Sequence, residues 1–322
     1  MCIALISTAH PDYSLIIIDN RDEFLHRPTS LPDWWEEPFV HVLGSRDLAR
    51  STQGTWMGVT RQGKVAVLTN YREPTATAAV GAYSRGRIVN SWLTASPNEK
   101  HSTHSFVQAM VNGPEAKSVG GFSLVCGRIN EPLAIVSNRS SSMNHITWVA
   151  AEKNQTLGLS NTSVDDRSWP KIINGEKLIA AAIDDHVQSQ ENEDVLIECL
   201  LRVLSTDTLP KYEGPTPIDT DAFSINFRKS IFIPGLGIQD HDDRKVEESS
   251  TGHGEGETGK SQLNGHLDQN YSSGPYGTQK QTILLAQADG RIRYFERTLY
   301  DNNAKAIPIG QGDRNFDFYI EK

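Results

Sequence analysis

Short apolar runs and stretches with helical period follow one another in blocks, and their order constrains the fold most strongly. Three groups of runs predict strands, because they are short, apolar or β-branched, and bounded by turn residues. Helical periods fall between the groups. Strand groups separated by helices favour a layered α+β fold with antiparallel sheets over a βαβ alternation. The predicted strands are 2–7, 13–19, 55–60, 64–69, 122–126, 132–136, 146–149, 156–159, 282–286 and 292–295, and the predicted helices are 85–94, 101–111, 169–187 and 194–204.

One polar stretch interrupts this order before the last two predicted strands. Residues 239–275 contain almost no large apolar side chain and are rich in Gly, Ser, Asp and Glu. Such a segment cannot offset its ordering entropy by burial, so we expect a disordered acidic insertion in a single domain that spans 1–322. Residues 254–261 match the phosphate-loop pattern, but no strand precedes them and Gly265 would end any helix after them. We therefore expect no nucleotide site there.

Charge and hydropathy exclude several classes of protein. With 31 Lys and Arg against 40 Asp and Glu, the net charge of −9 argues against binding nucleic acid or anionic membranes by bulk electrostatics. Apolar runs such as 15–18 are far too short to span a bilayer, and no basic segment precedes this run as in a secretory signal. Three cysteines form no paired framework. These features predict a cytoplasmic protein without a transmembrane segment or a nucleic-acid partner.

Cys2 directly follows the initiator methionine. Removal of Met1 would leave a thiol and an α-amino group on one residue, with ordinary pKa values of about 8.5 and about 7.7–8.0. The amine can then act as the base for the thiol, as in N-terminal-nucleophile hydrolases. The alternative is that Cys2 only packs as a small hydrophobic residue.

The second predicted strand ends in a burst of polar residues, in the order Asn20, Arg21, Asp22 and Glu23. The hairpin formed by 2–7 and 13–19 would bring them beside Cys2. Asn20 and Asp22 would share one face of a regular strand, with Arg21 and Glu23 on the other. Asp22 would hold the α-amino group and Arg21 would favour the thiolate. Alternatively, Arg21 and Glu23 pair on a solvated strand end.

Asn70 and Asn161 each end a predicted strand. A carboxamide at a strand tip can donate a hydrogen bond to an oxyanion, although it can equally satisfy a turn. Metal-binding motifs are absent from the sequence, since His101 and His104 form a pair without an evident third ligand. We therefore expect no metal site.

The sequence resembles the NRDE family, the transport and Golgi organisation protein 2 homologues, over essentially the whole chain outside 239–275. The resemblance implies an αββα sandwich of the N-terminal-nucleophile-hydrolase type. It also implies, by similarity to the penicillin-acylase and bile-salt-hydrolase branch of that fold, a nucleophile at Cys2, an amine-holding group at Asp22, and an oxyanion hole at Asn70 and Asn161. The segments that carry the resemblance are 1–3, 20–24, 27–28, 54–58, 68–72, 84–86, 158–161, 169–171 and 276–278.

Two positions depart from the pattern. The branch has Arg-Asn-x-Asp, whereas Arg21 of this chain stands two residues later, after Asp19. NRDE relatives tend to have Arg after Tyr-Gly-Thr, where this chain has Gln279 followed by Lys280. Both departures weaken the positive field that would activate Cys2, and they tip the prediction from catalysis toward binding.

The resemblance implies roles in Golgi organisation and secretion, in mitochondrial lipid metabolism and in haem mobilisation. We therefore expect a trafficking protein or carrier, without a required cofactor, that binds a small hydrophobic or acyl ligand near Cys2 and associates peripherally with Golgi or mitochondria. Haem is one candidate ligand, and Cys2, His10 or His26 would supply its axial ligand. Trp34, Trp35 and Trp56 would be core or lid. The alternative is an amidohydrolase or acyltransferase that cleaves a non-peptide C–N amide bond with Cys2.

Overall fold

The computed structural model describes all residues except 74, 76–80, 96–101, 211–224, 239–272 and 322. The disorder predicted for 239–275 therefore falls, up to residue 272, outside the described residues. The phosphate-loop match at 254–261 and His101 lie outside them as well.

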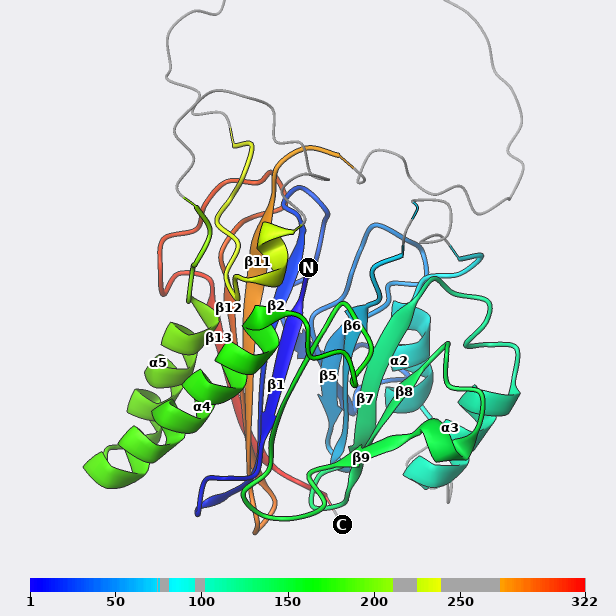
Figure 1. Cartoon of the computed structure of the whole chain (residues 1–322), viewed down its shortest axis with the longest axis horizontal. Coiled ribbons are helices and arrows are strands. Elements are labelled where there is room, and N and C mark those ends of the chain that lie inside the picture. The colour runs from blue at the N-terminus through cyan, green and yellow to red at the C-terminus, as the bar shows by residue number, and fades with distance from the viewer. Residues whose placement is uncertain (74, 76–80, 96–101, 211–224, 239–272, 322) are drawn as a thin grey trace, which may run out of the picture.

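Two antiparallel sheets form the centre of the molecule (Figure 1). The first has the order β10-β1-β2-β11-β12-β13 and the second the order β3-β4-β5-β6-β7-β8-β9. The strands of the first sheet are β1 (Ile3–Ser7), β2 (Tyr13–Phe24), β10 (Thr156–Ser160), β11 (Tyr276–Gln287), β12 (Arg291–Thr298) and β13 (Asp313–Tyr319). Those of the second are β3 (Asp33–Trp34), β4 (Val42–Gly44), β5 (Met57–Thr60), β6 (Lys64–Asn70), β7 (Phe122–Arg128), β8 (Leu133–Ser137) and β9 (Thr147–Val149).

One pair of helices covers the outer face of each sheet, so the molecule has four layers (Figure 1). Helices α4 (Pro170–Ser189) and α5 (Glu193–Leu204) lie on the first sheet, and α2 (Gly86–Leu93) and α3 (Thr103–Asn112) on the second. Two 3₁₀ turns, η1 (Met143–His145) and η2 (Asn226–Arg228), complete the described elements. No helix in the described part of the chain is long and apolar enough to cross a membrane.

Alternation along the central strands separates three apolar layers. On β2, Ile17 packs between the sheets with Leu284 of β11 and Val67 of β6. Its neighbours Ile16 and Ile18 point the other way, into the layer under α4 and α5. A third layer lies between the second sheet and α2 and α3. This arrangement confirms the predicted α+β αββα sandwich of two antiparallel sheets.

The structure adds to the predicted strands. The polar residues from Asn20 onward, which were predicted to end the second strand, form the last part of β2, which runs to Phe24 and pairs with β11. A further strand, β13, closes the chain where two strands were expected to end it. Its inward residues Phe316 and Phe318 alternate with polar residues, so β13 has no continuous apolar run from which a strand could be predicted. Phe318 packs against Trp34 with ring centroids 5.0 Å apart.

A pair of buried histidines ties the β1–β2 hairpin to the junction of α4 and α5. The Asp12 backbone N–H donates to His10 Nδ1 over 3.1 Å, so the proton of His10 lies on Nε2. That group donates to His186 Nδ1 over 3.1 Å, and His186 Nε2 donates to the Asn192 carbonyl over 3.1 Å. His10 is therefore held in its neutral form, because a proton added to its Nδ1 would face the Asp12 N–H donor.

The histidine pair predicts a loss of stability in mild acid. Burial, together with His186, lowers the pKa of His10, although Asp12 opposes the shift. The unfolded chain therefore binds more protons, and the stabilisation present above pH 6.5 is lost as the pH falls below it. We expect the melting temperature to drop between pH 7.5 and pH 5 by on the order of 2 °C more in the wild type than in His10→Gln. Exposed His145, changed to Gln, is the control, and identical pH slopes in wild type and His10→Gln would refute the prediction.

Candidate functional site

A cleft of about 360 Å³ opens at the chain's N-terminus and collects most of the predicted site residues. Cys2, Arg21, Asp22 and Asn70 all line it. Asn161 is buried nearby at the end of β10, where its carbonyl accepts from the Arg72 backbone N–H over 2.9 Å. Its side-chain Oδ1 has no hydrogen-bond partner among the described residues. The other lining residues are Glu23, Phe24, Arg27, Asp47, Arg50, Gly54, Thr55, Trp56, Leu68, Gly81, Tyr83, Ser84, Arg85, Gly86 and Gly120.

The β1–β2 register places the polar residues of β2 as the alternation predicted. Ile3 pairs with Asn20, so Cys2 lies beside the next part of β2. Asn20 points toward the helices, where its Nδ2 donates to the carbonyls of Leu204 and Ile231 over 2.8 and 2.9 Å. Asn20 therefore links β2 to the end of α5 and to the segment around Ile231, both of which lie outside the first sheet. Arg21 points the opposite way, into the cleft.

The Asp22 carboxylate lies beside the α-amino group of Met1, whereas the predicted partner is the α-amino group that Cys2 would carry after removal of Met1. The Met1 nitrogen lies 3.4 Å from Asp22 Oδ2 and also donates to the Tyr276 hydroxyl. Thr278 Oγ1 donates to the other carboxylate oxygen over 2.7 Å. Lys171, fully buried on α4, donates to the Met1 carbonyl. The Asp22 carboxylate thus pairs with the N-terminal ammonium, and its charge also raises the pKa of Lys171 against the effect of burial.

Cys2 carries a neutral thiol in this arrangement. Its side chain is 9% exposed, and its Sγ donates to the Asp22 carbonyl over 3.7 Å. Burial raises the pKa of Cys2 to about 11, although the nearby N-terminal ammonium pulls it down. With Met1 in place, the thiol therefore stays protonated near neutral pH.

The Arg21 guanidinium is held by groups other than Cys2. It donates to Asp47 over 2.9 Å and to Gln279 Oε1, and it lies 4.7 Å from the centre of the Trp56 ring. Gln279 in turn donates to the carbonyls of Leu25 and of Arg27. Arg21 thus lines the cleft, and its charge is shared with Asp47.

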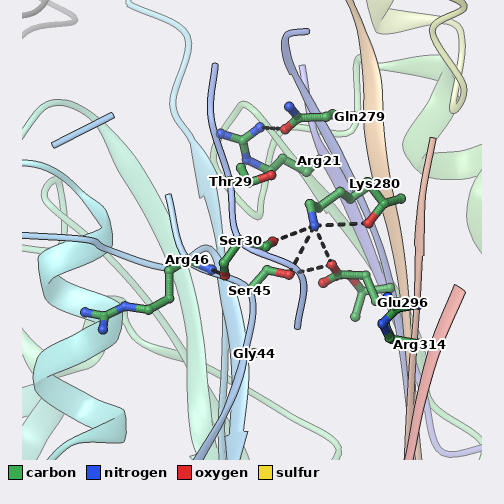
Figure 2. Close-up of polar contacts among 12 residues, drawn as sticks. Arg21, Thr29, Ser30, Gly44, Ser45, Arg46, Gln279, Lys280, Glu296 and Arg314 are labelled. Atoms are coloured by element: carbon green, nitrogen blue, oxygen red, sulfur yellow. Dashed lines mark hydrogen bonds and ion pairs between the residues drawn. The ribbon is translucent and has the colours of Figure 1, made fainter. Parts of the chain in front are cut away.

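Lys280, which follows the position where relatives tend to have arginine, lies between the sheets and does not line the cleft. Its ammonium donates to Glu296 Oε1 over 2.8 Å, to the Ser30 carbonyl over 2.9 Å and to the hydroxyls of Ser45 and Thr298 (Figure 2). A bulge in β11 produces this placement, because the pairing with β2 shifts between Thr278 and Lys280.

Asp19 is a buried carboxyl group to which sequence reasoning gave no role. Neither of its oxygens has a hydrogen-bond partner among the described residues. Burial raises the pKa of Asp19 well above its usual value, and the charges of Asp22 and Glu296 add to the shift. These effects favour the protonated form of the Asp19 carboxyl group.

Three cleft arginines were missed because their partners are distant in sequence. Arg27 and Arg85 lay inside segments that carried the family resemblance, while Arg50 lay in none. The start of α2 reaches the cleft through close contact between Gly54 and Gly86. A Cβ on either glycine would lie 2.8 Å from the Cα of the other, which explains why both are glycine. Only this tertiary contact brings Arg85 into the wall.

Of the three candidate haem ligands, only Cys2 lines the cleft. His10 is bound to His186, and His26 packs beside Phe24 with ring centroids 6.3 Å apart. Among the tryptophans, Trp56 lines the cleft, while Trp35 is buried under α2 and α3. In the part of the chain that the structure describes, no group of three or more His, Cys, Asp or Glu side chains could hold a metal ion.

Comparison with known proteins gives a consistent family match. The family model described as Transport and Golgi organisation 2 matches residues 1–301. The human Transport and Golgi organization protein 2 homolog is 26% identical over 297 residues, which cover 90% of this chain and 88% of that protein. An uncharacterised Saccharomyces cerevisiae protein is 24% identical over 318 residues, which cover 94% and 93%. The Drosophila melanogaster Transport and Golgi organization protein 2 is 23% identical over 295 residues, which cover 89% and 87%.

Solved structures show more distant likenesses. A Caenorhabditis elegans ortholog of N-acylethanolamine-hydrolyzing acid amidase has 14% identity and a TM-score of 0.42, covering 62% of this chain and 85% of its own. The C2A mutant of conjugated bile acid hydrolase from Clostridium perfringens has 11% identity and a TM-score of 0.40, covering 99% and 97%. Both scores are low, so the fold assignment stands on the strand order of this chain.

Proposed function

Because the chain belongs to the Transport and Golgi organisation 2 family, we propose that it is a carrier that binds a small hydrophobic or acyl ligand in the cleft beside Cys2. We further propose that this ligand, haem or an acyl lipid, is trafficked between compartments and that the protein acts from the cytoplasm at Golgi or mitochondrial membranes. The family name supports transport and Golgi organisation, and the cleft supports the choice of ligand.

The observation that carries the proposal is a cleft of ligand size that is lined by a cysteine whose thiol is kept neutral. Its volume of about 360 Å³ suits a small molecule. Phe24, Trp56 and Leu68 give it apolar walls. A Cys2 thiol with a pKa of about 11 behaves as a small apolar group near neutral pH, which favours holding a ligand over attacking it.

The proposal is tested by titrating the protein with dodecanoate and with haemin, following tryptophan fluorescence and calorimetry. Phe24→Ala removes an apolar wall of the cleft and should weaken dodecanoate binding about tenfold. Phe318→Ala, an aromatic truncation on β13 beside Trp34, is the matched control and should leave the affinity unchanged. The proposal fails if neither ligand binds saturably, or if Phe24→Ala and Phe318→Ala bind alike.

Haem binding through Cys2 has its own signature. The thiol must lose its proton to coordinate iron, so haemin affinity should rise with pH between 7 and 9 while dodecanoate affinity stays flat. Cys2→Ala should abolish the pH dependence of haemin binding. A pH-independent haemin affinity in the wild type would remove Cys2 as the axial ligand.

A second candidate is an N-terminal-nucleophile amidohydrolase, and it is favoured by the Asp22 carboxylate 3.4 Å from the α-amino group. If Met1 is removed, the Cys2 amine would take the thiol proton while sulfur bonds to the amide carbonyl carbon. The C–N bond then breaks, the amine leaves with that proton, and water hydrolyses the thioester. Asn70, in the same cleft, would donate to the oxyanion, with Asn161 at the adjacent strand end. An acyl mass on Cys2 after incubation with an N-acyl amide would support this candidate, and wild-type function of a Cys2→Ala copy in cells would defeat it.

A further inference from the structure

We propose that a side pocket next to the cleft binds the far end of the ligand's apolar chain, so that the ligand class is a long-chain acyl compound. The inference rests on the proposed function, because it names the ligand class and the chain length that the cleft beside Cys2 would carry. The side pocket has a volume of about 290 Å³. It lies between α2 and the segment that follows α3, and its walls include Tyr83, Ile88, Ser91, Pro114, Ser118 and Val119.

The side pocket continues the cleft, because the same two stretches of chain line both. In the stretch that leads into α2, Gly86 lines the cleft and Ile88 lines the side pocket. In the opposite stretch, Gly120 lines the cleft and Val119 lines the side pocket. Tyr83 belongs to the walls of both cavities. An apolar chain that leaves the cleft along Tyr83 therefore enters the side pocket.

The backbone between the two cavities is held in place, whereas the Tyr83 ring can move. The Tyr83 N–H donates to the Ser118 carbonyl over 3.2 Å, and Tyr83 forms a parallel bridge with Val119. Gly81 packs so closely on this stretch that a Cβ there would lie 2.3 Å from the Gly120 nitrogen. The Tyr83 side chain is 49% exposed. Exposed side chains change rotamer quickly, so the ring can turn aside for a passing chain.

The chemistry of the side pocket suits an apolar chain. Ile88 and Val119 are both buried apolar residues in its wall. The Ser91 hydroxyl already donates to the Ile88 carbonyl over 2.8 Å, and the Ser118 hydroxyl donates to the Glu115 carbonyl over 2.7 Å. Both serine hydroxyl protons are therefore used within the protein. A chain of methylene groups fits such a wall without leaving these donors unpaired.

Chain length gives this inference a measurable consequence. Each methylene group that leaves water for an apolar site raises the affinity about fourfold. A chain that outgrew an isolated cleft would leave its last methylene groups in water, and the affinity would stop rising. With the side pocket in use, the affinity keeps rising with chain length beyond that point.

The test titrates the protein with octanoate, dodecanoate and hexadecanoate at pH 7.5, below the concentrations at which they aggregate. Hexadecanoate should bind the wild type more tightly than dodecanoate by about tenfold or more. Ser91→Phe and Ser118→Phe each place a ring in the side pocket and should abolish that gain while leaving octanoate affinity unchanged. Ser189→Phe, at an exposed position on α4, is the matched control and should keep the gain.

A second measurement locates the chain end in the wild type and needs no variant. Hexadecanoate that carries a nitroxide at its methyl end should broaden the methyl NMR signals of Ile88 and Val119. Octanoate labelled in the same way should leave these two signals sharp, since its chain ends within the cleft. Broadening by the long chain at other methyl groups but not at these two would overturn the inference.

The outcomes separate this inference from the proposed function. If dodecanoate binds but hexadecanoate binds no more tightly, or if both phenylalanine variants keep the gain, the side pocket is overturned while the carrier function stands. If none of the three chains binds the wild type, the proposed function falls and the inference falls with it. Thermal melts identify any variant that fails to fold, and the nitroxide measurement on the wild type then decides.

Discussion

Replacing Lys280 by methionine should lower the free energy of unfolding by about 3–5 kcal/mol. Lys280 and Glu296 form an ion pair at 2.8 Å in which both side chains are fully buried. Burial lowers the pKa of Lys280 and Glu296 opposes that shift, so each charge depends on the other. Methionine fills a similar volume but leaves the Glu296 carboxylate in the interior without a positive partner.

A double variant separates loss of the pair from loss of packing. Lys280→Met with Glu296→Gln removes both charges, and we expect it to recover a large part of the lost stability. Lys177→Met, an exposed lysine on α4, is the matched control. Urea unfolding measures all three, and a loss below about 1 kcal/mol in Lys280→Met would show that the pair is not held as the structure has it.

Asp22→Asn is the second substitution with a large expected effect, a loss of about 3 kcal/mol. The change leaves the α-amino group and Lys171 in a buried site without a negative charge. Burial already lowers the pKa of both groups, while Asp22 is the strongest influence that raises it. We expect both groups to lose their protons more easily in the variant, so its deficit should shrink as the pH rises toward 9.

Glu23→Gln is the matched control for Asp22→Asn, because Glu23 is the next residue on β2 and only half-buried. Its cost should be under about 1 kcal/mol. Adding Lys171→Met to Asp22→Asn should restore part of the stability, since one of the two stranded charges is gone. Equal losses in Asp22→Asn and Glu23→Gln would mean that Asp22 does not hold the chain terminus.

The sequence predicts the layers well because burial leaves a periodic trace. Ile17 packs in the apolar layer between the sheets, while Ile16 and Ile18 pack in the layer under α4 and α5. The face of α2 that carries Val89 and Trp92 is buried, as the helical period of the sequence indicates. Polar strand ends leave no such trace. The last part of β2 has no apolar alternation, since its ionisable residues are buried by pairing with β11 rather than by apolar packing.

The sequence indicates which residues lie together in the cleft only where they are close along the chain. Cys2 and Asp22 meet because a hairpin joins neighbouring segments, which sequence spacing can show. Arg85 reaches the cleft beside the contact of Gly54 with Gly86, and Lys280 is placed outside the cleft by a bulge in β11. Neither a distant glycine contact nor a one-residue shift in register has a signature in a single sequence.

The central claim is that Cys2 sits in the cleft as a neutral thiol and does not act as a nucleophile. The measurement that tests it most directly is the rate of Cys2 alkylation by iodoacetamide against pH, read by mass on the N-terminal peptide. The same peptide shows whether Met1 is present. The urea-unfolded chain serves as the reference, and its rate should level off above about pH 9.

With a Cys2 pKa of about 11, the account predicts that the alkylation rate of the folded protein keeps rising about tenfold per pH unit up to pH 10. The shape of the profile decides, because burial alone would slow the reaction equally at every pH. A rate that levels off by pH 8 would contradict the account, since it would show an activated thiolate and favour the hydrolase.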